Sequence, residues 1–181
     1  MAVNGPGLDV TNYSSDCFLA QSVYVWQTSN NFAEAGWYEE DVDITVCTDV
    51  SAPHFLAFVR VDGTPGCQSQ VGSSSISQAF HGFKLENDNH NMSFTYWLDG
   101  NVQVTQDTNF TQGKVFAAAE RHVDGDHLGA EFDGLKWLGA AGTWNDWDQL
   151  TGHKDSVSWD NVSDFDFCKR SNKHFEIRAS C

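Results

Sequence analysis

Two glutamates in apolar surroundings are the residues of this sequence best suited to acid–base chemistry. Glu34 lies in the run from Asn31 to Tyr38, among small and aromatic residues, with Gly36 leaving open space on the same face of a strand. Glu120 follows three alanines, a smooth strand surface that a ligand backbone can approach closely. Apolar surroundings disfavour a charged carboxylate, so we expect the pKa of Glu34 to be raised, as an acid catalyst needs.

The two carboxyl groups would act as a pair if a sheet brought Glu34 and Glu120 into one groove. Like charges held close together cannot both ionise easily, so one group keeps its proton at mildly acidic pH. The ionised group can then activate water, while the protonated one protonates or polarises the substrate. The alternative is that Glu34 is a solvent-facing residue of an edge strand.

A short motif around Glu34 has a counterpart in a known family. Glu34-Ala-Gly-Trp, followed by a cysteine-bounded segment and the aromatic strand that begins at His54, resembles the Glu-Ala-Gly-Trp strand of neprosin-type glutamic peptidases. The related fungal eqolisins carry a glutamine at the position matched by Glu34. The resemblance implies a peptidase in which Glu34 and, on a later strand, Glu120 are catalytic. Glu120 is preceded by Ala-Ala where the family pattern suggests Gly-Gly.

A second cluster combines imidazoles and carboxylates in the segment from His122 through Asp124 and Asp126 to His127. Oxygen ligands would suit calcium and the histidines zinc. The spacing matches no standard metal loop, and Asp-Gly-Asp is also a plain turn. We therefore predict no metal and no cofactor, while a calcium ion near Asp124 and Asp126 stays open.

Tryptophans beside Asp and Asn form a third candidate site, at Trp137, Trp144, Trp147 and Trp159. Exposed indole rings of this kind can stack on sugars, and the alternative is that they anchor the core of a sandwich. For the hydrolase hypothesis we predict five aromatic substrate-binding residues, some near Glu34 and some among these tryptophans. They are Trp37, Tyr38, Trp97, Trp144 and Trp147.

Charge and composition restrict the partners. Ten Lys and Arg face 25 Asp and Glu, which gives a net charge of −15 over 181 residues. A protein with this negative charge repels phosphate backbones and anionic lipids. We therefore expect no nucleic-acid partner and no membrane insertion. No run reaches the length of a membrane-spanning helix, and no signal peptide is visible at the N-terminus. The composition favours a secreted protein that meets an extracellular polypeptide or polysaccharide.

Five cysteines without a CxxC pair argue against a zinc knuckle or redox motif and predict two disulfides with one spare thiol. Cys47 and Cys67 bracket a probable strand pair and are the expected partners. Cys17 would then join Cys168 or Cys181. Buried free thiols in a cytosolic protein are the alternative.

Period-two alternation interrupted by Gly, Asn, Asp and Pro predicts short strands throughout the chain. Asp99-Gly100 between two such runs predicts a hairpin with a primed turn. The expected strands are 17–27, 32–38, 41–47, 55–61, 79–86, 93–98, 102–105, 114–121, 131–138, 164–168 and 173–178. This pattern is typical of an all-β fold, an antiparallel β-sandwich or concanavalin-like jelly roll, formed by residues 1–181 as one domain.

Three functions remain open at this point. The first is a secreted hydrolase similar to glutamic endopeptidases, with Glu34 and Glu120 activating water at acidic pH. The second is a carbohydrate-binding or cell-surface-binding module that uses its tryptophans. The third is a jelly-roll polysaccharide lyase, although no grouping of Arg, His and Tyr indicates that chemistry. A sandwich fold by itself does not choose among them.

Overall fold

The structure is a computed structural model in which the placement of most strands is described. The described residues are 2–9, 19–40, 50–62, 64–65, 69–70, 77, 79–87, 91–121, 130–139, 141–147, 166–171, 173–178 and 181. Within them the regular elements are strands, and no helix is long and apolar enough to cross a membrane.

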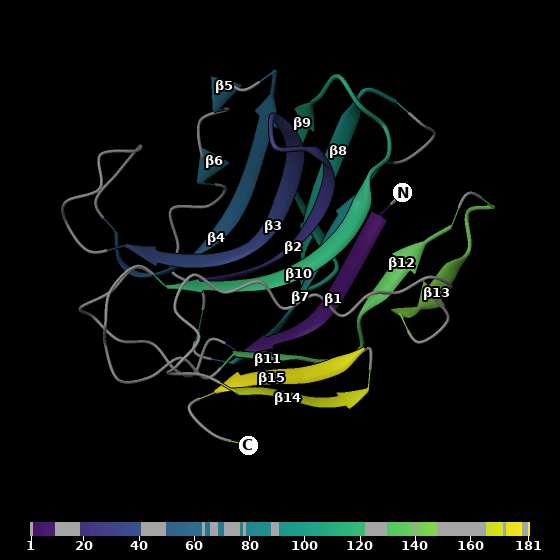
Figure 1. Cartoon of the computed structure of the whole chain (residues 1–181). Coiled ribbons are helices and arrows are strands. Elements are labelled where there is room, and N and C mark those ends of the chain that lie inside the picture. Colours follow the sequence, from purple (N-terminus) through teal and green to yellow (C-terminus); the bar gives the residue numbers. More distant parts are fainter. Residues whose placement is uncertain are drawn as a thin grey trace.

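The strands form two antiparallel sheets (Figure 1). The β7 sheet has the order β14-β15-β11-β1-β7-β8-β9, with β12 paired to β1 and β13 paired to β12. Its strands are β1 (Ala2–Asp9), β7 (Phe80–Glu86), β8 (Ser93–Leu98), β9 (Asn101–Asp107), β11 (Ala130–Phe132), β12 (Lys136–Leu138), β13 (Trp144–Asp146), β14 (Asp166–Ser171) and β15 (His174–Arg178). The β3 sheet has the order β10-β2-β3-β4-β5, with β6 beside β4. Its strands are β2 (Leu19–Thr28), β3 (Asn31–Glu40), β4 (Val50–Val61), β5 (Thr64–Pro65), β6 (Ser69–Gln70) and β10 (Lys114–Arg121).

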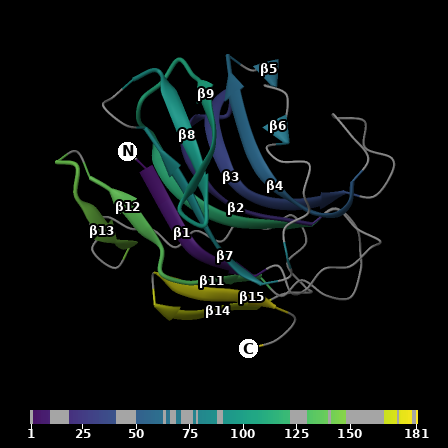
Figure 2. The same ribbon diagram turned by 180° about the vertical axis from the view of Figure 1, so that it is seen from behind.

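Alternate residues of the two sheets meet in a hydrophobic core between them, and a second buried cluster lies on the other face of the β3 sheet, formed by Ala20, Phe32, Tyr38, Leu56 and Phe58. Val23 of β2 and Ala35 of β3 are fully buried in the core between the sheets, together with Phe83 of β7 and Tyr96 of β8. Phe55 of β4 stacks on Phe83 across the two layers, with ring centroids 5.9 Å apart. Both views show the two layers face to face (Figures 1 and 2). The predicted all-β sandwich is therefore confirmed, and its jelly-roll topology stays a prediction.

The hairpin predicted at Asp99-Gly100 is confirmed. Leu98 of β8 pairs with Asn101 of β9, and the two residues between them have positive φ angles of 49° and 77°. Two positive φ angles in a two-residue loop define a primed turn, which matches the twist of the strands it joins.

One expected strand is divided in the structure, and one strand was not expected. The predicted strand 131–138 is divided into β11 and β12, because Gly134 between them has a φ of 66° that interrupts the extended chain. The sequence analysis also missed β1, whose glycines and proline are unusual in a strand. β1 lies inside the β7 sheet, where it pairs with β7 over seven register positions and also with β11 and β12.

The disulfide pattern also differs from the prediction. Cys168 of β14 is bonded to Cys181, so neither can be the partner of Cys17. The bond closes a loop of 13 positions and ties residue 181 to an edge strand, with Cα atoms 5.5 Å apart. Cys17, Cys47 and Cys67 lie outside the described residues, as does the predicted strand 41–47.

Candidate functional site

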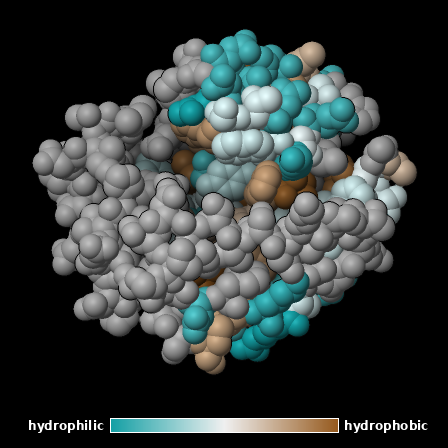
Figure 3. All heavy atoms as spheres, in the orientation of Figure 1, coloured by the Kyte–Doolittle hydropathy of each residue, from teal (hydrophilic) through white to brown (hydrophobic). Residues whose placement is uncertain are grey.

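The candidate site lies on the Glu34 face, which we define as the alternate residues of β10, β2, β3 and β4 that point away from the core. Figure 1 shows these strands bent along their length, with the hollow of the bend turned away from the β7 sheet. In the space-filling view of the same side, hydrophobic atoms lie at the bottom of a hollow (Figure 3). A bent sheet of this kind gathers side chains from several strands.

Strand register arranges the Glu34 face in rows that cross the sheet. Glu34 of β3 lies opposite Phe58 of β4 and Tyr24 of β2, and Tyr24 lies opposite Phe116 of β10. The next row contains small residues on three of its four strands. It consists of Leu56, Gly36, Ser22 and Ala118. A band of small side chains therefore runs beside the glutamate.

Ser22 fixes the Glu34 carboxylate. Its hydroxyl donates a hydrogen bond of 2.6 Å to Glu34 Oε1. Ser22 is fully buried, while Glu34 is partly exposed. Gly36 lies opposite Ser22, and a methyl group at Gly36 would overlap the Gln21 carbonyl oxygen and lie 2.7 Å from Ser22 Cα. Gly36 is thus needed for β2 to approach β3 closely enough at this point.

Aromatic rings surround the carboxylate. Phe32 packs against Phe58 with centroids 5.5 Å apart and against Tyr24 at 6.3 Å. Trp26 stacks on Phe32 at 4.8 Å and meets the exposed Phe116 edge-on at 6.2 Å. The expectation that Glu34 has aromatic company is confirmed, so the site combines a fixed carboxylate with apolar walls.

Tyr96, in the core behind the strand of Glu34, is close enough to be affected by the charge of Glu34. Tyr96 reaches across from β8 and donates a hydrogen bond of 2.8 Å to the carbonyl oxygen of Phe58, the residue opposite Glu34. Burial of the hydroxyl raises the pKa of Tyr96 well above its usual value, and the negative charge of Glu34 raises it further. Glu34 thus helps to keep the Tyr96 hydroxyl protonated.

Glu120 occupies a different row from Glu34. It lies opposite Ala20 of β2, four residues along that strand from Tyr24, the residue opposite Glu34. With about 3.3 Å per residue along a strand and about 4.8 Å between strands, the two Cα positions are on the order of 16 Å apart. β2 and the band of small residues therefore separate the two glutamates.

An open hollow of about 310 Å³ lies at the edge of the same sheet. Its lining residues come from β2 and from the segment that leads into β10. They are Trp26, Gln27, Gln112, Gly113 and Lys114. Trp26 is two residues along β2 from Tyr24, so the hollow adjoins the row that contains Glu34. An indole ring beside two amide side chains can stack on a sugar ring and bind its hydroxyl groups.

The tryptophans predicted to bind substrate do not form one surface. Trp37 and Trp147 are 3% and 6% exposed and belong to the core, so their assignment as substrate-binding residues is corrected. Trp37 instead donates a hydrogen bond of 2.9 Å to Gln21. Trp97 lies on β8 of the other sheet, where Lys84 covers its ring at 3.8 Å.

The remaining predicted residues divide between the sheets. Tyr38 is on the Glu34 face but only 2% exposed, and Trp144 is a partly exposed residue of β13. Trp137 of β12 is partly buried and packs against the core. Trp159 and the cluster from His122 to His127 lie outside the described residues. The sequence analysis did not single out Trp26, although its position two residues from Tyr24 on the same face was a readable signal.

Ser77, His81 and Asp99 form a chain of hydrogen bonds that the sequence analysis did not predict. His81 Nδ1 is 2.7 Å from Asp99 Oδ2, and His81 Nε2 is 3.1 Å from Ser77 Oγ. His81 Nε2 also lies 2.9 Å from the Ser77 carbonyl oxygen, which only accepts hydrogen bonds. The Asp99 carboxylate also only accepts, so which ring nitrogen of His81 donates depends on the tautomer. This arrangement ties Ser77 to the hairpin.

One group of described residues has the donor atoms and closeness of a metal site. Glu131 of β11 and His174 and Glu176 of β15 place one ligand atom each within 4.8 Å of one another. No metal was predicted from the sequence, and this group could not be read from it, because Glu131 and His174 are 43 positions apart in the chain.

Comparisons with known proteins add no assignment. No protein-family model matches the chain, and no curated protein matches it either.

Proposed function

We propose that this protein is a hydrolase of extracellular polypeptides in which the Glu34 carboxylate activates water. The observation that carries the proposal is the setting of Glu34, a partly exposed carboxylate held by a buried hydroxyl at 2.6 Å among aromatic rings on a bent sheet. A fixed, partly desolvated carboxylate is what a general base requires. A disulfide and a net charge of −15 support an extracellular location.

The reaction needs a base and an acid. Ionised Glu34 takes a proton from water as the water oxygen adds to the carbonyl carbon of the scissile peptide bond. Protonated Glu120 donates a hydrogen bond to the carbonyl oxygen, which becomes negative. When the carbon–nitrogen bond breaks, the proton on Glu34 passes to the leaving amine, so the products are a carboxylic acid and an amine.

The register positions of the two glutamates are too far apart for a directly shared proton. The row of Gly36, Ser22 and Ala118 runs between their register positions. Gly36 and Ser22 of this row are buried, so we propose that the substrate binds beside the partly exposed Glu34 and not along the row itself. The two carboxyl groups then act on the same substrate without sharing a proton.

The test is cleavage of an unstructured protein between pH 3 and pH 7 by the wild-type chain and by Glu34→Gln and Glu120→Gln. We expect cleavage at acidic pH and a loss of at least about 100-fold in kcat/KM for Glu34→Gln. Glu86→Gln is the matched control, because Glu86 is a partly buried glutamate of the other sheet that pairs with Lys84 at 2.6 Å. Unchanged cleavage by folded Glu34→Gln would overturn the proposal. If Glu34→Gln lost cleavage activity and Glu120→Gln kept it, only the proposed role of Glu120 would be rejected.

Carbohydrate binding is a second candidate, and the hollow beside Trp26 favours it. We propose that a sugar ring stacks on Trp26 while Gln27 and Gln112 bind its hydroxyl groups. Soluble oligosaccharides should then quench tryptophan fluorescence in the wild-type chain and not in Trp26→Ala. Trp144→Ala is the control, since Trp144 lies on the β7 sheet. Equal quenching in wild type and Trp26→Ala would contradict this assignment.

A further inference from the structure

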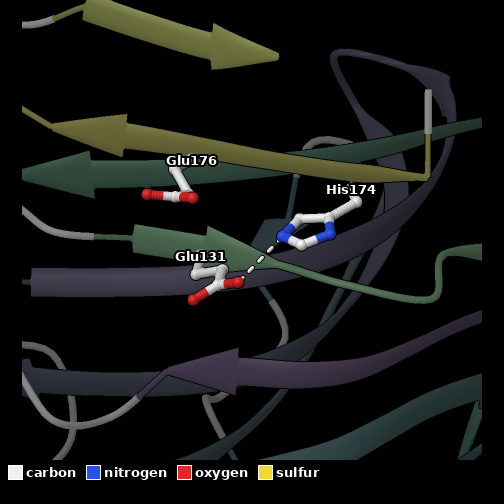
Figure 4. A group of neighbouring side chains, drawn as sticks. All are labelled: Glu131, His174 and Glu176. Carbon is white, nitrogen blue, oxygen red and sulfur yellow. Dashed lines mark hydrogen bonds and ion pairs between the residues drawn. The ribbon is translucent and has the colours of Figure 1, made fainter. Parts of the chain in front are cut away.

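A group of three metal-ligating side chains lies on the β7 sheet, far in sequence from Glu34. Glu131 and Glu176 are directly opposite each other on β11 and β15, and His174 is two residues from Glu176 on the same strand. Side chains with this spacing share one face of a sheet. Figure 4 shows the His174 ring beside the two carboxylates, with its contact to Glu131. We call these three residues the His174 cluster.

The local charge of the His174 cluster favours a cation. Two carboxylates directly opposite each other on neighbouring strands repel. Asp133 adds a third, with Oδ1 3.5 Å from His174 Nδ1. Positive charge near them includes Arg170, 2.8 Å from Glu176 Oε1, and His174 when it is protonated. The Arg170 side chain is 62% exposed and is free of the core, so it can leave Glu176 to another cation.

The orientation of His174 suits metal coordination. Its Nε2 faces Glu131 Oε1 at 2.8 Å, while its Nδ1 faces Asp133 on the other side of the ring. A carboxylate beside the second ring nitrogen is the usual support of a metal-bound histidine, because it fixes the ring and its tautomer. The strands hold the backbone of all three ligands, and Phe132 and Phe175 stack at 4.8 Å in the core directly behind them.

We propose that Glu131, His174 and Glu176 bind one divalent transition-metal ion, with Zn²⁺ as the ion that fits best. One imidazole nitrogen with two carboxylate oxygens is a ligand set for zinc, whereas calcium needs six to eight oxygen ligands. The three ligands join β11 to β15 and leave a fourth coordination position for water. This site is independent of Glu34 and of the proposed hydrolysis.

The test is a calorimetric titration of the chelator-treated full chain with Zn²⁺, accompanied by thermal unfolding. We expect one Zn²⁺ per chain and a higher Tm with Zn²⁺ than with the same concentration of Ca²⁺. His174→Gln and Glu131→Gln should each weaken Zn²⁺ binding by more than about tenfold, and Asp133→Asn by about tenfold through the orientation of His174. Circular dichroism of each variant checks that it folds.

His81→Gln is the matched control, because His81 also pairs with a carboxylate at 2.7 Å but has no place in the cluster. It should bind Zn²⁺ as the wild-type chain does. Absence of Zn²⁺ binding in the millimolar range would overturn the proposal. Equal binding by wild type, His174→Gln and Glu131→Gln would overturn it as well, because the ion would then be held elsewhere.

Discussion

Carboxylates on the two sheets have very different neighbours. On the β3 sheet, Glu34 accepts a hydroxyl hydrogen bond and is surrounded by aromatic rings. On the β7 sheet, Glu131 and Glu176 are paired with a histidine and an arginine. The first setting places a carboxylate beside a hydroxyl group and aromatic rings, and the second places carboxylates beside groups that carry or can carry positive charge. The same residue type therefore has different electrostatic surroundings on the two sheets, and our two proposals, hydrolysis and metal binding, rest on that difference.

Among these variants, Gly36→Ala is expected to cause the largest loss of stability, and it acts beside Glu34 on the β3 sheet. The added methyl group overlaps the backbone of Gln21 and lies 2.7 Å from Ser22 Cα, so β2 and β3 must separate beside Glu34. We expect a loss of roughly 3 kcal/mol in the free energy of unfolding, measured by urea denaturation. Gly82→Ala is the control, since its nearest neighbour would be Asp99 Oδ1 at an ordinary 3.8 Å. Equal stability of the two variants would contradict the close approach of β2 and β3.

Tyr96→Phe tests whether the core beneath Glu34 depends on its polar contact. Without the hydroxyl, the buried Phe58 carbonyl oxygen loses a hydrogen bond of 2.8 Å. We expect a loss of about 1–2 kcal/mol in the free energy of unfolding, measured by urea denaturation. Tyr24→Phe should cost less, because Tyr24 is partly exposed. A larger loss in Tyr24→Phe would reverse this order.

Arg170→Ala tests the charge balance of the His174 cluster. Without the guanidinium, the repulsion between Glu131 and Glu176, which lie opposite each other, is less compensated. Because the Arg170 side chain is highly exposed, water screens its contribution and the effect is small. We expect the free energy of unfolding, measured by thermal unfolding with chelator present, to fall by about 0.5–1 kcal/mol. Adding Glu131→Gln to Arg170→Ala should recover part of that loss, because one of the opposed charges is gone. A further loss in the double variant would show that repulsion is not the cause.

The smallest effect concerns His54, which lies on the Glu34 face opposite Tyr38. Burial lowers the pKa of His54 from its usual 6.5. Between the lowered pKa and 6.5 the unfolded chain binds more protons than the folded one, so stability rises with pH in this window and falls on acidification. His54→Gln should flatten the slope of Tm against pH just below 6.5. An identical slope in both proteins would remove His54 as a cause.

Much of the fold follows from local signals in the sequence, and the sites follow only in part. Alternating residues predicted β3 and β7, and Asp99-Gly100 predicted a turn, because period and φ preference act over a few residues. β1 was missed, since its place in the sheet is set by partners far along the chain. The His174 cluster was missed for the same reason, because only the pairing of β11 with β15 brings its residues together.

The tryptophans show where residue type is insufficient. An indole ring serves equally well as a core anchor or a binding surface, and only tertiary packing distinguishes the buried Trp147 from the partly exposed Trp26. The predicted role of Glu34 required less tertiary information. Phe32 and Gly36 are two residues from Glu34 in sequence, so strand alternation places them on its face. Tyr24 and Phe58 reach it only through the pairing of β3 with β2 and β4.

The edge position of β10 has a consequence for colloidal behaviour. β10 ends the order of its sheet in the described part of the chain, and Phe116 on it is 41% exposed. At neutral pH a net charge of −15 keeps two such edges apart. Acidification neutralises carboxylates and weakens that repulsion. We therefore expect self-association through β10 to become strongest at the acidic pH at which hydrolysis is proposed, so dilute protein and light scattering belong in every acidic assay.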